Sequence, residues 1–214
     1  MSNDRQQRLD EIAARIRQCT DCALYQEATN AVPGAGHAHA EIMFIGEGPG
    51  FHEDKQGLPF VGRSGDYLNY LLNLIDLKRE QVFITNVVKH RPPDNRDPQL
   101  DEIIACKHYL DEQITVIQPM VIATLGRFSM ARYFPDAKIT RIHGQPKYEG
   151  IPITAYYPLF HPAAALRNPN LRHDMEADIK RLPEIVAKVK EMRAGGDAPP
   201  PDHDDEPPQQ LSLF

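Results

Sequence analysis

Short apolar runs alternate with amphipathic stretches along most of this chain. Four runs are rich in β-branched and aromatic residues and have the length of buried strands: 41–45, 82–88, 120–125 and 153–160. Apolar residues recur at helical spacing in four other stretches: 5–17, 67–75, 99–117 and 174–192. This alternation predicts an α/β fold, a three-layer sandwich in which helices cover a central, mostly parallel, four-stranded sheet.

The chain divides into one domain and a tail. Its 214 residues suffice for a single domain with its own core, which we assign to residues 1–193. Residues 194–209 are mainly Gly, Pro and acidic residues, a composition that predicts a disordered tail over 194–214. Because we find neither an apolar signal core nor a run of about 18 apolar residues, we expect a cytoplasmic monomer that contacts no membrane.

The charge distribution changes how the acidic composition is interpreted. The formal net charge is −6, yet the tail contains five acidic residues and no basic residue. The rest of the chain is therefore close to neutral. Nucleic-acid binding depends on Lys and Arg contacts to phosphates, so this balance neither supports nor excludes it.

Two polar loops follow predicted strands at equivalent places. Residues 46–54, GEGPGFHED, follow the first strand, and residues 161–169, HPAAALRNP, follow the last. In an open parallel sheet the ligand crevice lies beyond the carboxyl ends of the strands. We therefore expect Glu47, Glu53 and His161 to face one ligand.

Three segments resemble the signature segments of family 4 uracil-DNA glycosylases. They read GEGPGFHEDKQGLPFVGRSG from Gly46, ITNVVKHRPPDNRDP from Ile84 and HPAAALRNP from His161. A lone glycine-rich loop is a weak signal, whereas three long motifs in order are a strong one. The resemblance implies a nucleoid-associated bacterial enzyme that flips uracil out of DNA and hydrolyses its N-glycosidic bond, which starts base excision repair.

Uracil release leaves negative charge on the base and positive character on the sugar, and the protein must stabilise both. We assign this catalysis to Glu47, Glu53, Asn86 and His161. His161 would donate to uracil O2, while the Asn86 amide would pair with O4 and N3–H and thereby refuse cytosine. Glu53 would orient the water or offset the sugar charge, with Glu47 close to the base. Taken alone, these residues could equally be a turn cap, a strand end and a solvated acidic loop.

The resemblance also implies two contact sets. The uracil pocket would comprise Gly46, Gly48, Phe60, Asn86 and His161, with Phe60 stacked on the flipped base. The DNA contacts would comprise Gly62, Ser64, Ala165, Leu166 and Arg167, with Leu166 as a wedge and Arg167 as a phosphate clamp. Without the family, Phe60 would be a core residue, the glycines turns, and Leu166 part of a helical turn. Ser64 is also placed to cap the helix that follows it.

The chain contains three cysteines, which cannot all pair, so in the cytoplasm they indicate metal ligation or buried thiols. The family holds a 4Fe-4S cluster with four cysteines. Cys19, Cys22 and Cys106 match this pattern, and His90 occupies the remaining position. Because imidazole can replace thiolate at iron, we expect a Cys3His cluster; structural zinc with the same ligands is the alternative.

The chain ends in QLSLF, which is similar to the pentapeptide by which bacterial repair proteins bind the DNA sliding clamp. Gln210, Leu211, Leu213 and Phe214 would make that contact, and a frayed terminus is the alternative. Two other functions stay open. One is a non-catalytic or covalently trapping uracil-DNA-binding module tethered to the clamp; the other is a nucleotide hydrolase, although no P-loop lysine follows the glycine run.

Overall fold

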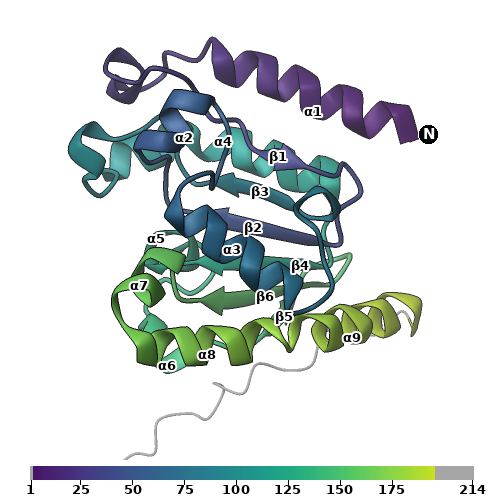
Figure 1. The fold of residues 1–214 in the computed structure, drawn as a ribbon. Coiled ribbons are helices and arrows are strands. Elements are labelled where there is room, and N and C mark those ends of the chain that lie inside the picture. The colour runs from purple at the N-terminus through teal and green to yellow at the C-terminus, as the bar shows by residue number, and fades with distance from the viewer. Residues whose placement is uncertain (1, 196–214) are drawn as a thin grey trace, which may run out of the picture.

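A six-stranded sheet forms the centre of the protein, and helices cover both of its faces (Figure 1). The structure is a computed structural model that describes residues 2–195. The sheet order is β1-β3-β2-β4-β6-β5. Its strands are β1 (Ala35–Gly36), β2 (Ile42–Gly46), β3 (Phe83–Asn86), β4 (Val121–Leu125), β5 (Lys147–Glu149) and β6 (Thr154–Leu159).

The predicted α/β fold with a mostly parallel sheet is confirmed, but the predicted number of strands is wrong. The four parallel strands β3, β2, β4 and β6 are the four predicted from the apolar runs. The additional strands β1 and β5 are antiparallel edges of two and three residues. Such short, partly exposed segments have too few residues to show a two-residue period.

Successive residues of the central strands supply opposite faces of the sheet. In β2, Phe44 packs into the core on one side while Met43 and Ile45 pack into the core on the other. One core is closed by α3 (Arg63–Asn73), α8 (Pro169–Ile179) and α9 (Leu182–Gly195). The second core is closed by α1 (Ser2–Arg17) and α4 (Leu100–Ile117). Burial on both faces explains why the strand sequences are continuously apolar.

Two helix predictions need correction. The helix predicted over 174–192 is two helices, α8 and α9, interrupted at Lys180 and Arg181. Pro183 lies in the first turn of α9, where its missing N–H costs nothing, whereas within one continuous helix it would remove a hydrogen bond. The N-cap of α3 is Gly62 and not Ser64, so Ser64 lies inside the first turn.

The remaining helices are short. They are α2 (Phe51–Gln56), α5 (Arg127–Ala131), α6 (Ile139–Ile142) and α7 (Pro162–Arg167), with 3-10 turns η1 (Ala23–Gln26), η2 (Arg79–Gln81) and η3 (Pro93–Asn95). Within residues 2–195, no helix combines the length and apolar character that a membrane span requires.

Candidate active site

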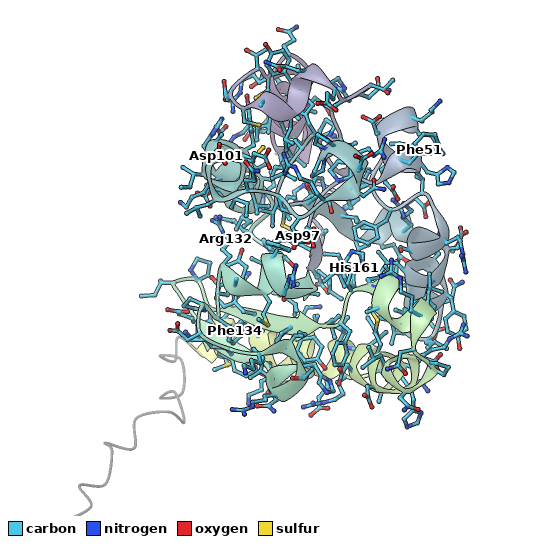
Figure 2. The ribbon with its side chains drawn as sticks, turned by 90° about the vertical axis from the view of Figure 1, so that its left-hand side faces the viewer. Phe51, Asp97, Asp101, Arg132, Phe134 and His161 are labelled. Atoms are coloured by element: carbon cyan, nitrogen blue, oxygen red, sulfur yellow. The ribbon has the colours of Figure 1, made fainter. Side chains whose placement is uncertain are left out.

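A cavity of about 450 Å³ opens beyond the carboxyl ends of the parallel strands. Figure 2 views the molecule from this side and labels His161. The cavity brings together most of the predicted site residues from distant chain segments. Its lining consists of Glu47, Gly48, Pro49, Gly50, Glu53, Phe60, Ser64, Asn86, Pro92, Asn95, Arg96, His161, Ala163 and Arg167.

Four of the residues predicted to contact uracil or DNA lie outside this lining. Gly46 lies directly behind the cavity, because a Cβ there would stand 2.4 Å from Asn86 Oδ1. Gly62 begins α3, and Ala165 is buried within α7. Leu166, 36% exposed, projects from the same short helix and is accessible at the surface. Its exposure is compatible with a wedge, while Ala165 can contact a ligand only through backbone.

Asn86 ends β3 and supplies the floor of the cavity. Its side chain is 1% exposed, and its Oδ1 has no hydrogen-bond partner within the described residues. Buried polar atoms are nearly always hydrogen-bonded, and leaving one unpaired costs about 1–3 kcal/mol. An unpaired amide oxygen that lines a cavity is therefore a ready acceptor for a ligand donor.

A buried lysine fixes the backbone beneath this amide. Lys89 Nζ donates to the Asn86 carbonyl at 2.8 Å, to Thr85 Oγ1 at 2.7 Å and to Gln113 Oε1 at 2.9 Å. Its side chain is fully enclosed, and this burial lowers the pKa of Lys89 to about 7. The three acceptors explain how so polar a group is accommodated in the core.

His161 has its protonation state fixed by local structure. It is the N-cap of α7, and its Nδ1 accepts a hydrogen bond from the Ala163 N–H at 3.1 Å. Burial lowers the pKa of His161 to about 4; the Glu53 charge opposes this and the Arg167 charge adds to it. The ring is therefore neutral at pH 7, with its hydrogen on Nε2. It can donate one hydrogen bond into the cavity.

Phe60 lies beside this imidazole in a strained backbone conformation. The two ring centroids are 5.8 Å apart, with an interplanar angle of 33°. Phe60 has φ 51°, a region that costs a non-glycine residue free energy. Arg79 holds this conformation, since its guanidinium donates to the carbonyls of Pro59 and Phe60. Gly65 is required opposite, because a Cβ there would lie 1.8 Å from the Phe60 oxygen.

The two predicted acids have different surroundings. Glu53 Oε1 accepts hydrogen bonds from the N–H groups of Val61 and Gly62, at 3.1 and 3.2 Å, which anchors α2 to the loop before α3. Burial raises the pKa of Glu47 to about 7; Asp97 adds to this effect and Arg127 opposes it. Glu53 is thus held in place, while Glu47 changes charge near neutral pH.

The three cysteines share one corner of the molecule. Cys19 and Cys22 pack against the core that contains Cys106 of α4. Burial raises the pKa of Cys106 to about 11, and the nearby Cys22 and Cys19 thiols raise it further, while Lys89 lowers it. His90 is buried, and this burial lowers its pKa and keeps it neutral. Neutral imidazole and clustered thiols are the donor types that iron and zinc bind.

These donors do not converge on one point. Among residues 2–195, no group of three or more His, Cys, Asp or Glu side chains is placed to hold a single metal ion. A tetrahedral zinc site needs all four ligand atoms around one centre. A 4Fe-4S cluster distributes its ligands over four irons.

Sequence reasoning missed the part of the wall made by Pro92, Asn95 and Arg96. Asp94 and Asn95 both have positive φ, at 53° and 55°, within the segment that lines the cavity. Arg96 is held by Glu102 through an ion pair of 2.6 Å. The Pro-Pro-Asp-Asn sequence predicts a loop, but nothing in it indicates which neighbouring segment that loop covers.

Comparison with known proteins agrees with this geometry. Residues 33–182 match the model of the uracil DNA glycosylase superfamily. The chain is 48% identical over 191 residues to the type-4 uracil-DNA glycosylase of Sulfurisphaera tokodaii, covering 85% of this chain and 86% of that protein. It is 47% identical to the type-4 enzyme of Saccharolobus solfataricus, over 84% of this chain and 87% of the other, and 43% identical to that of Archaeoglobus fulgidus, over 84% and 94%.

Proposed function

This chain belongs to the uracil-DNA glycosylase superfamily and, within it, to the type-4 enzymes; from that premise we propose how its cavity releases uracil from DNA. The reaction is hydrolysis of the bond between deoxyribose C1′ and uracil N1, the step that starts base excision repair. The base must leave the helix before this bond can be reached, so the cavity has to accept a flipped nucleotide.

The unpaired Asn86 Oδ1 is the observation that carries this proposal. Uracil presents N3–H as a donor beside the O4 acceptor, and an amide can satisfy both by accepting at Oδ1 and donating from Nδ2. Cytosine presents an acceptor at N3 and a donor at C4, which leaves the buried oxygen facing another acceptor. The cavity floor therefore favours uracil over cytosine.

His161 is suited to stabilise the departing base. As the glycosidic bond breaks, negative charge develops on uracil O2, and a preorganised donor aimed at that atom lowers the barrier. The Ala163 N–H occupies Nδ1, so the Nε2–H is the donor that remains. A neutral donor also does not transfer its proton to the base early, because imidazole is a weak acid. Phe60 would stack against the same base.

The carboxylates would act on the sugar side. Glu53, fixed by the Val61 and Gly62 N–H groups, is placed to offset positive charge on deoxyribose or to orient the water. Glu47 would do so in its ionised form, close to the base. Leu166 would enter the space left by the nucleotide, and Arg167 would bind a flanking phosphate. The DNA backbone could come close to Gly62, Ser64 and Ala165, because these residues are small.

We propose that Cys19, Cys22, His90 and Cys106 hold a 4Fe-4S cluster. When bound, the cluster links the segment after α1 to His90 and α4 by covalent bonds to iron. The cluster would have a structural role. It would fix His90, and the neighbouring Lys89 donates a hydrogen bond to the Asn86 carbonyl. Replacing Cys106 with Ser is expected to lower the iron content and the visible absorbance of the purified protein; unchanged iron content would contradict the assignment.

The C-terminal residues 210–214 lie outside the described part of the chain. We propose that Gln210, Leu211, Leu213 and Phe214 tether the enzyme to the sliding clamp on cytoplasmic, nucleoid DNA. Deleting them should abolish co-elution with the clamp while activity on short oligonucleotides stays unchanged. Co-elution of the truncated protein would contradict this role.

The decisive experiment is incubation with a uracil-containing oligonucleotide followed by alkali, which cleaves the strand where a base is missing. We expect scission with the wild-type protein and its loss in Asn86→Ala and His161→Ala. His37→Ala, at the other end of the sheet, is the matched control. Binding without scission would favour the non-catalytic module, and a protein–DNA adduct that survives denaturation would favour the covalently trapping one.

A further inference from the structure

Next to the rim of the cavity, but outside it, two cationic side chains pack over the ring of one aromatic side chain. Phe51, the first residue of α2, is 48% exposed. Lys55 Nζ lies 5.1 Å from the centroid of its ring and Arg91 Cζ lies 5.3 Å from it. The two cations are therefore no more than about 10 Å apart, although they come from separate segments. Figure 2 shows Phe51 on the same side of the molecule as His161.

This cluster of Phe51, Lys55 and Arg91 is joined to the cavity at two points. Gly50, which precedes Phe51, lines the cavity. Arg91 Nε donates to Asn95 Oδ1 at 2.8 Å, and Asn95 also lines the cavity. The cluster is thus a continuation of the rim formed by α2 and the loop after β3. Arg167 and Ala163 of α7 line the cavity as well.

Lys55 and Arg91 differ from Arg96 and Arg127 in having no carboxylate partner among the described residues. Arg96 pairs with Glu102 and Arg127 pairs with Asp97. Within residues 2–195, neither Lys55 nor Arg91 forms an ion pair. Cation–π contacts attract a cation without neutralising it. The Phe51 ring therefore holds the Lys55 and Arg91 charges close together, and both charges stay available to bind an anion.

We propose that Phe51, Lys55 and Arg91 form a phosphate subsite that binds the DNA strand one nucleotide or more away from the flipped uridine. This inference rests on the proposed function, because the uracil cavity supplies the strand. Both cations lie over the ring, so the cluster presents charge rather than an open aromatic face. A phosphodiester is the complementary group on a strand that leaves the cavity.

The subsite extends the strand path across the cavity. Arg167 on α7 would hold phosphate on one side, and the cluster would hold phosphate on the other. Two such contacts on either side of the flipped nucleotide would fix its register without reading sequence. Phe51 is in this scheme a positioning residue, since it acts by ordering two flexible cations.

Salt dependence provides the test. On a single-stranded uracil oligonucleotide, Lys55→Ala/Arg91→Ala should raise KM about tenfold at low salt, as expected for loss of a charge-assisted contact, and leave kcat unchanged. The slope of log kcat/KM against log salt should become shallower by about 0.7, the value for one phosphate on a single strand. Phe51→Leu, which keeps both charges but removes the ring quadrupole, should raise KM less.

The matched control is Lys188→Ala. Lys188 lies 4.6 Å from the Tyr148 ring centroid and belongs to α9, so this change removes a cation–π contact without touching the cavity. Its KM and salt slope should equal those of the wild-type enzyme. A series of substrates can each carry one uncharged methylphosphonate, placed at successive linkages. At a single linkage this change should raise the KM of the wild-type enzyme but not that of the double variant.

The proposal of this subsite would be refuted if the wild-type enzyme releases uracil and the double variant has the same KM and the same salt slope as the wild type. If the wild-type protein releases no uracil, the proposed function fails instead. The subsite is then tested by fluorescence anisotropy with the same intact oligonucleotides. In that assay an unchanged salt slope in the double variant would equally refute it.

Discussion

Two cavities of almost equal size lie at opposite ends of the sheet, and only their chemistry separates them. The candidate active site measures about 450 Å³, and the second cavity, beside the amino ends of β2 and β3, about 430 Å³. Of the buried unpaired side-chain atoms in residues 2–195, Asn86 Oδ1 lies in the first and none in the second. The second cavity is lined by His37, His39, Glu41, Ile42, Leu77, Glu80, Gln81 and Val82.

His37 and Glu41 of the second cavity have partners within the protein. His37 Nδ1 accepts from the His39 N–H at 3.2 Å, and Glu41 forms an ion pair of 2.6 Å with Lys190. Its histidines and acids resemble a site by composition, yet none of them is among the buried unpaired polar atoms of residues 2–195. Volume and residue type therefore do not identify a site. An unsatisfied polar atom that lines a cavity at the carboxyl ends of parallel strands does.

The largest effect is expected at the unpaired amide. Asn86→Ala should lower kcat/KM on uracil-containing DNA about 100- to 1000-fold, the usual result of removing one preorganised polar group from an active site. Asn86→Asp replaces the amide donor by a second acceptor. Its ratio of kcat/KM on cytosine to kcat/KM on uracil should be higher than that of the wild-type enzyme. Steady-state kinetics on both substrates measure this. Equal kcat/KM for Asn86→Ala and wild type would remove the distinction between the two cavities.

The second effect concerns pH. Since the pKa of Glu47 is raised to about 7, its ionised form increases as pH rises through that value, and kcat/KM should increase with it. His161 stays neutral over the same range because its pKa is about 4. Glu47→Gln should abolish the rise and lower activity about 100-fold at pH 8, within the range of acid–base catalysis.

Stability should change in the opposite direction. A carboxyl whose pKa is higher in the folded state binds its proton more tightly there. Between the ordinary pKa of Glu and about 7, the folded protein therefore holds more protons than the unfolded one, and stability falls as pH rises. Urea denaturation of wild type and Glu47→Gln at several pH values would check this. A wild-type profile of kcat/KM that is flat through pH 7 would contradict the role of Glu47.

A smaller effect is expected below the cavity floor. Lys89→Met removes the donor shared by Thr85, Asn86 and Gln113 and should destabilise the protein by about 1–3 kcal/mol through unsatisfied acceptors. Because Asn86 would lose its backbone support, kcat/KM should fall about tenfold. A decrease in stability without any decrease in kcat/KM would show that Lys89 supports only the fold.

The smallest effect is expected in the second cavity. His37→Ala and Glu80→Gln should leave kcat, KM and the pH profile within experimental error of wild type, since neither residue is among the buried unpaired polar atoms of residues 2–195. The same oligonucleotide assay applies. A tenfold loss of activity in either variant would mean that the second cavity also contributes to function.

Sequence reasoning reached those features that depend on local pattern. The four central strands follow from apolar runs, and Asn86 and His161 follow from their positions at strand ends within recognisable motifs. The contact of Arg79 with the carbonyls of Pro59 and Phe60 could not be predicted, because it joins segments through tertiary packing alone. The same holds for the position of Asn95 in the cavity lining. The edge strands were missed since two or three residues carry no period.

The strained backbone of Phe60 has a consequence for how the enzyme fails when heated. Its left-handed conformation persists only while Arg79 and the close approach of Gly65 hold it, at a cost of about 1–3 kcal/mol. Local relaxation of this segment releases that energy and needs no loss of the sheet. Catalytic turnover should therefore decline at temperatures where far-UV circular dichroism is still that of the intact protein, and recover on cooling.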